Sequence, residues 1–318
     1  QLSNRQKQEA NFRTSCLAAS LDPRILRETA TRGIVRNFEY FPEVSHGTDE
    51  TSLLVKGQMA PFPKETQYRP KKVGAVTYFD CAKIDKNFAQ NSRAKWMLTA
   101  RDAANNFRRR YYLKSTKNLH LWVRKHRNFL RRKGHEFAHM TADNEFDTVA
   151  MEELAAEPPQ FDFNFCAPHC HSQNPAESDI KAWRLRVRAV MEQARRDPKS
   201  KVKKHHWPYA SDCITDIENM SFCAQSPEMT PWESVYREQP DWSVAQIPMC
   251  RIWFYVYPDL RKNAPFANHR AEAIFCGICD KSSTLKLFNL ATGRVILRRY
   301  ADCVAREPDE VFDYNEIG

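Results

Sequence analysis

The sequence predicts an α+β protein, because helical periodicity and strand patterning occur in different parts of the chain. Apolar residues recur at helical spacing between Ile180 and Ala194. A continuous apolar and aromatic run at 252–257 and a hairpin pattern at 285–298 indicate strands nearer the C-terminus. Only 8 of the 318 residues are glycine, which disfavours folds built on glycine-rich loops. We therefore expect a basic helical N-terminal part and a smaller β-rich C-terminal part that a zinc ion could staple.

The distribution of charge indicates where these parts meet. The chain carries a net charge of +10, but formal charges sum to +12 over 73–140, −9 over 141–180 and +8 over 181–209. We expect a mainly helical basic region at 1–140, an acidic, proline-containing linker at 141–175, and a helix plus a β-rich region with an acidic tail at 176–318. The acidic block either folds over the basic helices and neutralises them, or leaves a basic face bare for a polyanion.

In the first half of the chain, Asp22-Pro23 predicts the start of a helix, and the proline-containing stretch 41–72 predicts irregular structure. Residues 73–79 have the β-branched and aromatic content of a strand. Apolar residues then step by four, three, four and four residues, which predicts a helix; they are Trp96, Ala100, Ala103, Phe107 and Tyr111. With a second helix over 119–131, this segment is predicted to form a basic helical hairpin.

In the second half, the alternation over 161–165 predicts a short strand. Asn174 fits the N-cap of a helix that runs to about residue 196, with Pro175 in its first turn and Glu177 at the third position. Residues 199–206 are expected to be mobile, and 210–250 to be irregular. The hairpin pattern places Gly293 in a tight turn.

Residues 135–139 read His-Glu-Phe-Ala-His, so they match the H-E-x-x-H pattern and resemble the zincin metallopeptidases over five positions. On a helix, His135 and His139 would share a face and bind zinc, while Glu136 would act as the general base. A third ligand could come from downstream acidic residues, namely Glu152, Glu153 or Glu157. Gly134 interrupts the expected helix, so the competing interpretation is a frayed basic helix end.

A second candidate metal site starts from Cys276-Gly277-Ile278-Cys279, which resembles a zinc knuckle. The tight C-x2-C turn lets two thiolates bind one Zn²⁺ ion, and a tetrahedral site needs two more ligands. The candidates for those ligands are Cys303, Cys166, Cys170 and His171, with Cys250 and His269 as further options. The alternative is that these cysteines are buried free thiols.

Basic residues interleaved with aromatic residues predict contact with nucleic-acid phosphates. The pattern occurs at 107–112, 122–126 and 203–207. Because the spacing favours burial of the aromatic rings, phosphate contact is expected rather than base readout. The candidate nucleic-acid-binding residues are Arg101, Arg108, Arg109, Arg110, Lys117, Arg124, Lys125, Arg127, Arg131, Arg132, Lys203 and Lys204.

These observations favour a non-enzymatic scaffold protein of a ribonucleoprotein-like or virion-like assembly. The sequence contains no glycine-rich nucleotide-binding loop, no nucleophile elbow and no kinase motif. Partners would be nucleic acid, with RNA favoured, or an acidic protein surface, together with other subunits. The alternatives are a zinc-dependent hydrolase using Glu136, and a self-assembling lattice protein with intermolecular disulfides.

Targeting patterns, apolar runs and cysteine content bear on where the protein is located. It has no signal-peptide pattern and no apolar run long enough for a membrane span. Its ten cysteines are too dilute for a disulfide framework. We expect an intracellular, reducing location and no membrane span.

Overall fold

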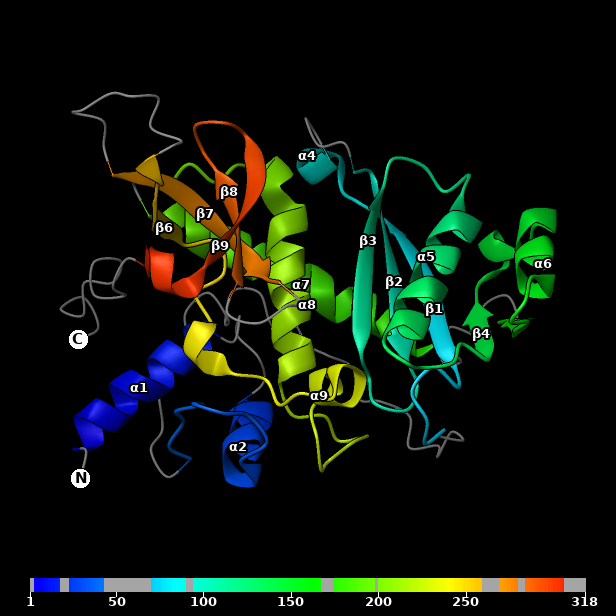
Figure 1. The fold of residues 1–318 in the computed structure, drawn as a ribbon, viewed down its shortest axis with the longest axis horizontal. Coiled ribbons are helices and arrows are strands. Elements are labelled where there is room, and N and C mark those ends of the chain that lie inside the picture. The colour runs from blue at the N-terminus through cyan, green and yellow to red at the C-terminus, as the bar shows by residue number, and fades with distance from the viewer. Residues whose placement is uncertain are drawn as a thin grey trace.

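A computed structural model of the chain describes residues 3–17, 23–42, 70–89, 94–166, 174–197, 200–258, 269–279 and 284–305. These residues form helices and two five-stranded sheets, which confirms the α+β class (Figure 1). The sheets lie toward opposite ends of the long axis, with helices between them (Figure 1). No helix in the described ranges has the length and apolar character needed to cross a bilayer.

The first sheet has the strand order β3-β2-β1-β4-β5. The strands β1, β2 and β3 form an antiparallel meander, whereas β4 runs parallel to β1 and β5 runs parallel to β4. Their bounds are β1 Thr77–Lys83, β2 Trp96–Asp102, β3 Arg108–Leu113, β4 His139–Ala142 and β5 Asp162–Phe165. The parallel connections pass through α5 (Leu119–Arg132) and α6 (Val149–Ala156), as parallel pairing requires.

The second sheet is antiparallel throughout, in the order β10-β6-β7-β8-β9. Its strands are β6 Arg251–Tyr255, β7 Arg270–Ile278, β8 Thr284–Asn289, β9 Arg294–Arg299 and β10 Cys303–Ala305. The turn between β8 and β9 has Gly293 at a φ of 65°, where a residue without a Cβ is favoured. The strand predicted over 252–257 and the hairpin predicted over 285–298 are confirmed.

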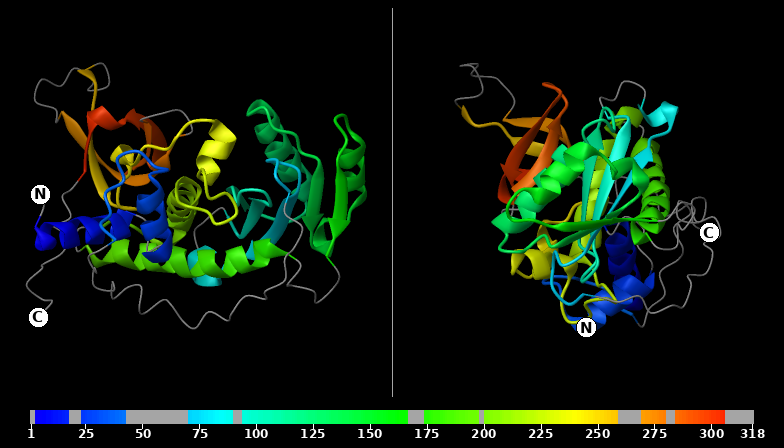
Figure 2. Two further views of the ribbon diagram at one scale, coloured as in Figure 1. Left: turned by 90° about the horizontal axis from the view of Figure 1, so that it is seen from below. Right: turned by 90° about the vertical axis from the view of Figure 1, so that its right-hand side faces the viewer.

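Two helices connect the sheets. The long α7 (Pro175–Arg196) runs along the length of the molecule, and α8 (Trp207–Met220) crosses it between the sheets (Figure 2). On one side α8 packs against β7 of the second sheet, and on the other against β3 of the first. The predicted start of α7 is confirmed, because the side chain of Asn174 accepts a hydrogen bond from the backbone N–H of Ala176 and Pro175 follows the cap.

The first sheet is buried on both faces. Consecutive residues Met97 and Leu98 of β2 are both fully buried, yet they belong to different cores. Leu98 faces α5 and α6, together with Phe79 and Met151, whereas Met97 faces α7 and α8 with Trp183. The second sheet shares this latter core through residues such as Phe254. The molecule is therefore held together by one core that continues from sheet to sheet and by a second core beneath α5.

The remaining helices are shorter or lie at the N-terminus. They are α1 Asn4–Leu17, α2 Pro23–Arg32, α4 Lys86–Ala89 and α9 Pro231–Tyr236, with 3-10 turns at Asn144–Phe146, Lys204–His206, Trp242–Val244 and Tyr300–Asp302. The helix predicted from Pro23 is confirmed by α2, as is the helix predicted over 119–131 by α5. The Asn11 side chain ties α1 to the backbone of Phe41 through two hydrogen bonds, of 2.6 and 2.8 Å.

The predicted basic helical hairpin is wrong in its first half, because residues 96–113 form strands β2 and β3. Burial on both faces of β2 removes the polar alternation that marks a half-exposed strand, so its apolar residues also fit a helical stripe. The turn between the strands has Asn106 at a φ of 62°, and the Asp102 carboxylate accepts hydrogen bonds from Gly74 and Ala104. The N-terminal part is consequently a mixed helix and sheet region.

The predicted linker at 141–175 is also wrong over its described residues. Residues 141–166 contain the end of β4, α6 and β5, and Met151 and Leu154 are fully buried in the core beneath α5. The strand predicted over 161–165 is confirmed by β5, which pairs with β4. Most acidic side chains of this segment are exposed, whereas apolar side chains such as Met151 and Leu154 are buried. Composition alone does not distinguish such a packed segment from a linker.

Two segments predicted to lack regular structure are ordered. Within 200–206, Val202 and His206 are buried, so the predicted mobile tail packs against the body of the protein. Within 210–250, α8 is buried nearly all round, which hides its helical period. Most of the irregular stretch predicted at 41–72, and the acidic tail after residue 305, lie outside the described residues.

Candidate active site

Asp80 on β1 and Asp143 just after β4 come from neighbouring parallel strands of the first sheet, and the charge of Asp143 acts on Asp80. The register of β1 and β4 pairs Thr77 with Met140 and Tyr78 with Thr141. Continuing that register by two residues places Asp80 of β1 next to Asp143, which follows the last residue of β4. Ligand sites of α/β sheets form where parallel strands end, because side chains from neighbouring strands meet there.

The first turn of α7 lies against the same strand. The Asn174 side chain donates a 3.0 Å hydrogen bond to the carbonyl oxygen of Phe79, the residue before Asp80, while its oxygen caps the helix. This contact is buried and fixes the start of α7 over β1. Glu177, in the first turn, is thereby brought close enough to Asp80 for their charges to interact. Three separate elements thus each contribute one carboxylate to a region in which the charges of Asp143 and Glu177 act on Asp80.

The surroundings of Asp80 disfavour the charged form of its carboxyl group. Asp80 is 7% exposed, and its Oδ1 accepts a 2.7 Å hydrogen bond from the backbone N–H of Cys81. Burial, and then the charge of Asp143, raise the pKa of Asp80 to about 7, with smaller contributions from Glu177 and Glu145. Within the described ranges, neither Asp80 nor Asp143 forms an ion pair with a basic side chain, and Glu177 pairs with Lys181 at 3.0 Å. A buried carboxyl group beside like charges either takes up a proton or has its charge offset by a bound cation.

Carboxylate oxygens are the ligands that Mg²⁺ and Mn²⁺ prefer. In the part of the chain that the structure describes, no three His, Cys, Asp or Glu side chains are gathered tightly enough to form a ready-made metal site. Repulsion between Asp80 and Asp143 favours such an open arrangement, and a divalent cation would offset it. Asp80, Asp143 and Glu177 have the oxygen donors that a hard cation prefers, and their side chains would have to draw closer together to bind one.

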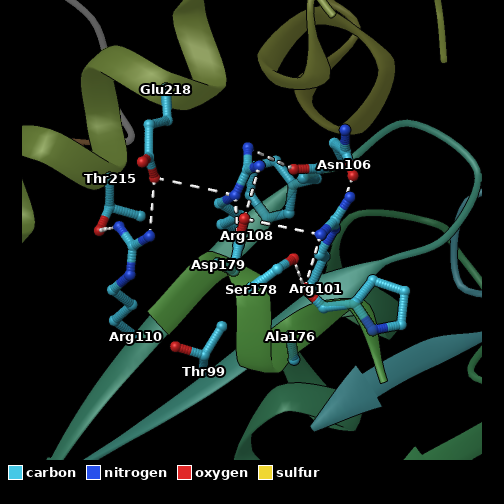
Figure 3. Close-up of polar contacts among 12 residues, drawn as sticks. Thr99, Arg101, Asn106, Arg108, Arg110, Ala176, Ser178, Asp179, Thr215 and Glu218 are labelled. Carbon is cyan, nitrogen blue, oxygen red and sulfur yellow. Dashed lines mark hydrogen bonds and ion pairs between the residues drawn. The ribbon is translucent and has the colours of Figure 1, made fainter. Parts of the chain in front are cut away.

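A buried network of ion pairs holds α7 in place over the first sheet. Figure 3 shows Asp179, two residues after Glu177, between Arg101 and Arg108. Both carboxylate oxygens of Asp179 accept hydrogen bonds from Arg108, at 2.5 and 2.8 Å. Arg101 donates a 2.8 Å hydrogen bond to the carbonyl oxygen of Pro175 in the first turn of the helix. Strands β2 and β3 thus fix the turn that carries Glu177.

The same network extends to α8. Glu218 forms ion pairs with Arg110, at 2.8 Å, and with Arg186 of α7, and it lies 3.8 Å from Arg108 (Figure 3). Asn219 binds the backbone of Arg108 on edge strand β3 through two 2.8 Å hydrogen bonds. Arginine charges hold the pKa values of Asp179 and Glu218 below their usual range despite burial. Both carboxylates are therefore ionised and bound to arginine.

Several of the predicted nucleic-acid-binding residues are engaged inside the protein. Arg101, Arg108 and Arg110 belong to the buried network. Arg109 lies over the ring of Phe129 at 3.8 Å. Arg124 and Arg127 both pair with Glu157, so the acidic segment neutralises part of α5. The remaining candidates are exposed and available to a partner; they are Lys117, Lys125, Arg131, Arg132, Lys203 and Lys204.

Two basic surfaces remain. One is an open hollow along α5, lined by Leu121, Arg124, Lys125, Asn128, Arg131 and Arg132, which we call the α5 basic face. The other consists of Lys181, Arg184 and Arg188 on α7, which are exposed and which we call the α7 basic stripe. Steps of four, three and four residues from Glu177 place the stripe on the same helix face as that carboxylate.

The H-E-x-x-H segment does not form the helix that a zincin needs. Helix α5 ends at Arg132, and Gly134 has a φ of 77°. His135 Nε2 lies 3.0 Å from the carbonyl oxygen of Val235, Glu136 is exposed, and His139 begins β4. The expected zincin geometry of His135, Glu136 and His139 is therefore wrong, because the chain leaves the helix before the first histidine.

The predicted zinc ligands lie in different places. Cys166 follows β5 of the first sheet, whereas Cys276 and Cys279 lie on or beside β7 and Cys303 begins β10 of the second sheet. Burial strongly raises the pKa of Cys276, which favours the neutral thiol over the thiolate that binds zinc. Gly277 allows a bulge next to Asp216, where a Cβ would approach Oδ2 to 2.7 Å. Cys170 and His171 lie outside the described residues.

A structural zinc ion stays a prediction that metal analysis can test. If the predicted site exists, the purified chain will contain one equivalent of zinc, and Cys276→Ala will remove it. A chain without zinc that folds normally contradicts the site.

Asp80 and Asp143 are not among the residues predicted from the sequence, and Glu177 was expected only to contribute to the start of a helix. The available indication was position: Asp80 follows Tyr78-Phe79 and Asp143 follows Met140-Thr141-Ala142, so both aspartates come after apolar or β-branched residues. That indication was hidden because the first strand was placed at 73–79, whereas β1 is Thr77–Lys83, and because 141–175 was taken as a linker.

Comparison with known proteins assigns no family to the chain. No family model matches it, and no curated protein is similar to it in sequence.

Proposed function

We propose that the protein catalyses phosphodiester cleavage or transfer on a nucleic acid, using divalent cations held by Asp80, Asp143 and Glu177. The observation that carries this proposal is the convergence of the three carboxylates from β1, the end of β4 and the first turn of α7. Carboxylate clusters of this kind bind Mg²⁺ or Mn²⁺ together with substrate phosphates.

The positive charges around the three carboxylates favour a nucleic acid as the substrate. The α7 basic stripe continues from Glu177 along the helix, and the α5 basic face adds a second exposed surface. The sequence offers no glycine-rich loop to hold a free nucleotide. A polymer with many phosphates fits two extended basic surfaces better than a single nucleotide does.

The chemistry assigned to this chain is positioning and charge stabilisation. A water or hydroxyl oxygen forms a bond to phosphorus while the bond between phosphorus and a sugar oxygen breaks. The attacking oxygen loses its proton to solvent, and the leaving sugar oxygen takes one up. The bound cations would stabilise the charge on the phosphate oxygens. Asp80, Asp143 and Glu177 would hold the cations, Arg184 would orient a neighbouring phosphate, and Lys181, which pairs with Glu177 at 3.0 Å, would do so once a cation takes its place.

Cleavage of a labelled DNA or RNA duplex in Mg²⁺ or Mn²⁺ tests the proposal. We expect wild type to cleave only with the metal present, and Glu177→Gln to lower the rate at least about a hundred-fold, since a direct ligand matters more than its outer partners. Glu192→Gln, an exposed position on the same helix, is the matched control and should cleave normally. Equal metal-dependent rates for the two variants would refute the assignment.

A second candidate is a non-catalytic scaffold that binds nucleic acid within an assembly. The α5 basic face favours it, because Lys125, Arg131 and Arg132 are exposed there and, unlike Arg124, form no ion pair with an acidic side chain of the described residues. Binding without cleavage under any metal would select this candidate. The disulfide-linked lattice gains no support, since the free cysteines of the described ranges are all buried or half-buried.

Both candidates predict salt-sensitive binding through the α5 basic face. We expect Arg131→Glu combined with Arg132→Glu to weaken nucleic-acid binding about ten-fold or more near 0.1 M salt, and to flatten the dependence of log K on log salt by about two. Filter binding over a salt series measures both. The control is Arg5→Glu combined with Arg13→Glu, which makes the same charge change on exposed positions of α1 at the opposite end of the molecule (Figure 1). Equal losses in both double variants would mean that α5 has no special role.

A further inference from the structure

A cleft next to the carboxylate cluster combines aromatic walls with positive charge. It has a volume of about 330 Å³ and lies between the end of β1, α4, α7 and the start of α8. Its lining comprises the aromatic residues Phe88, Trp183 and Trp207, the aliphatic residues Ile84 and Val187, the basic residues Lys83, Arg184 and Arg188, and Asp85. Three basic side chains against one acidic side chain make the cleft attractive to an anion.

The aromatic residues of the cleft form a rigid floor. The rings of Trp183 and Trp207 pack edge to face with centroids 5.8 Å apart, and both are almost fully buried. Trp183 donates its indole N–H to Ser211 at 2.7 Å, whereas the buried indole N–H of Trp207 has no acceptor among the described residues. Phe88 is half-buried at the side. The two tryptophans therefore support the cleft from the core, and Phe88 is the aromatic residue of the lining whose ring is accessible.

The cleft lies along both elements that position the cluster. Lys83 is three residues beyond Asp80 on β1, which corresponds to about 10 Å of strand. Trp183 and Arg184 follow Glu177 by six and seven residues, which corresponds to about 9–11 Å of helix. A strand whose phosphate lies at the carboxylates can therefore place a neighbouring nucleotide in the cleft.

We propose that this cleft holds one unpaired nucleotide of the nucleic-acid substrate, close to the phosphate at the carboxylates. Its base would contact the accessible ring of Phe88, above the floor that the buried tryptophans support, and its phosphate would lie against Arg184 and Arg188. An apolar and basic lining suits a ligand that is flat and carries negative charge. Stacking on an aromatic side chain tolerates every base, so no sequence preference is expected. The inference rests on the proposed function, because it assumes a nucleic-acid substrate, and it adds that the substrate has an unpaired end.

Binding of two matched duplexes tests the proposal. One duplex is blunt and the other has a short single-stranded overhang carrying 2-aminopurine, and both are measured with Ca²⁺ in place of Mg²⁺ to prevent turnover. We expect wild type to bind the overhang duplex about five-fold or more tightly and to quench its fluorescence. Phe88→Ala and Arg188→Glu should each abolish this preference, whereas Arg195→Glu, exposed on the same helix beyond the cleft, should retain it.

The outcomes separate this inference from the proposed function. Equal binding of the two duplexes by wild type, together with metal-dependent cleavage, overturns the cleft assignment and leaves the carboxylate site standing. A preference that survives both cleft variants also overturns it. If the protein neither binds nor cleaves either duplex, the proposed function fails and this inference fails with it. Arg188 is exposed, so its variant tests the cleft even where Phe88→Ala lowers stability.

Discussion

The Asp80→Asn variant is expected to lose metal-dependent cleavage, at least about a hundred-fold, while the metal-free protein becomes more stable at pH 8. Asn keeps the shape of the side chain and removes its charge. In the metal-free protein that charge is buried beside Asp143 and within range of Glu177. Loss of activity combined with a gain in stability is the result expected for a residue that serves a bound cation.

The sign of the pH dependence follows from the pKa of Asp80. Burial and neighbouring carboxylates raise that pKa from 3.8 to about 7, so the folded state holds a proton that the unfolded state releases. The contribution of Asp80 to the free energy of unfolding is therefore greatest below pH 4 and is lost as pH rises toward 7. Asp80→Asn should remove this loss, which is at most about 4 kcal/mol at pH 8, since the shift is about three pKa units and one unit corresponds to about 1.4 kcal/mol.

Urea unfolding at pH 5 and pH 8, with and without Mn²⁺, measures these effects. Mn²⁺ should stabilise wild type at pH 8 and leave Asp80→Asn unchanged. Asp147→Asn, an exposed aspartate close to Asp143 in sequence, is the control and should respond to Mn²⁺ as wild type does. A metal-free Asp80→Asn variant that is less stable than wild type at pH 8 would argue against the repulsive cluster.

Replacing Glu218 by Gln is expected to lower the free energy of unfolding by about 3–5 kcal/mol. Glu218 neutralises Arg110 and Arg186, and it lies 3.8 Å from Arg108. Arg110 is 1% exposed at its side chain, so removing the carboxylate charge leaves a buried guanidinium without compensation. We also expect the packing of α8 against β3 to weaken, because Glu218 on α8 pairs with Arg110 on β3.

Denaturant unfolding at pH 7 of Glu218→Gln and of Glu192→Gln checks this prediction. Glu192 forms an exposed ion pair with Arg195 at 3.7 Å on α7, and its loss should cost less than about 0.5 kcal/mol. Because arginines depress the pKa of Glu218, the wild-type advantage over Glu218→Gln should disappear as pH falls through that depressed pKa. Similar losses in the two variants would mean that the network contributes little to stability.

Sequence patterning identified elements with one clear exposed face or a clear cap. Helix α5 has one basic face and one apolar face. Helix α7 begins with Asn174-Pro175, and the β8–β9 hairpin has Gly293 in its turn. Sequence patterning failed for elements that are buried on all sides. Strand β2 is covered on both sides and α8 nearly all round, so neither shows the period that distinguishes strand from helix.

The candidate site was harder to predict than the fold, because its residues are far apart in the chain. Asp80 and Asp143 are brought together by the parallel pairing of β1 and β4. Glu177 joins them through the contact between Asn174 and Phe79 and through the arginines of β2 and β3 that hold the first turns of α7. Likewise, Arg108 and Arg110 have the composition of a nucleic-acid contact but meet Asp179 and Glu218 in the fold. Charge counted along the chain cannot distinguish a buried ion pair from an exposed face.

The most direct test of the proposed site is a titration with Mn²⁺ followed by electron paramagnetic resonance, in which protein-bound Mn²⁺ reduces the signal of the free ion. The carboxylate site predicts that wild type binds at least one Mn²⁺ per chain at pH 8, and that Asp80→Asn combined with Asp143→Asn abolishes this binding. Equal Mn²⁺ binding by wild type and the double variant, or no binding by wild type, would contradict a metal site at Asp80, Asp143 and Glu177.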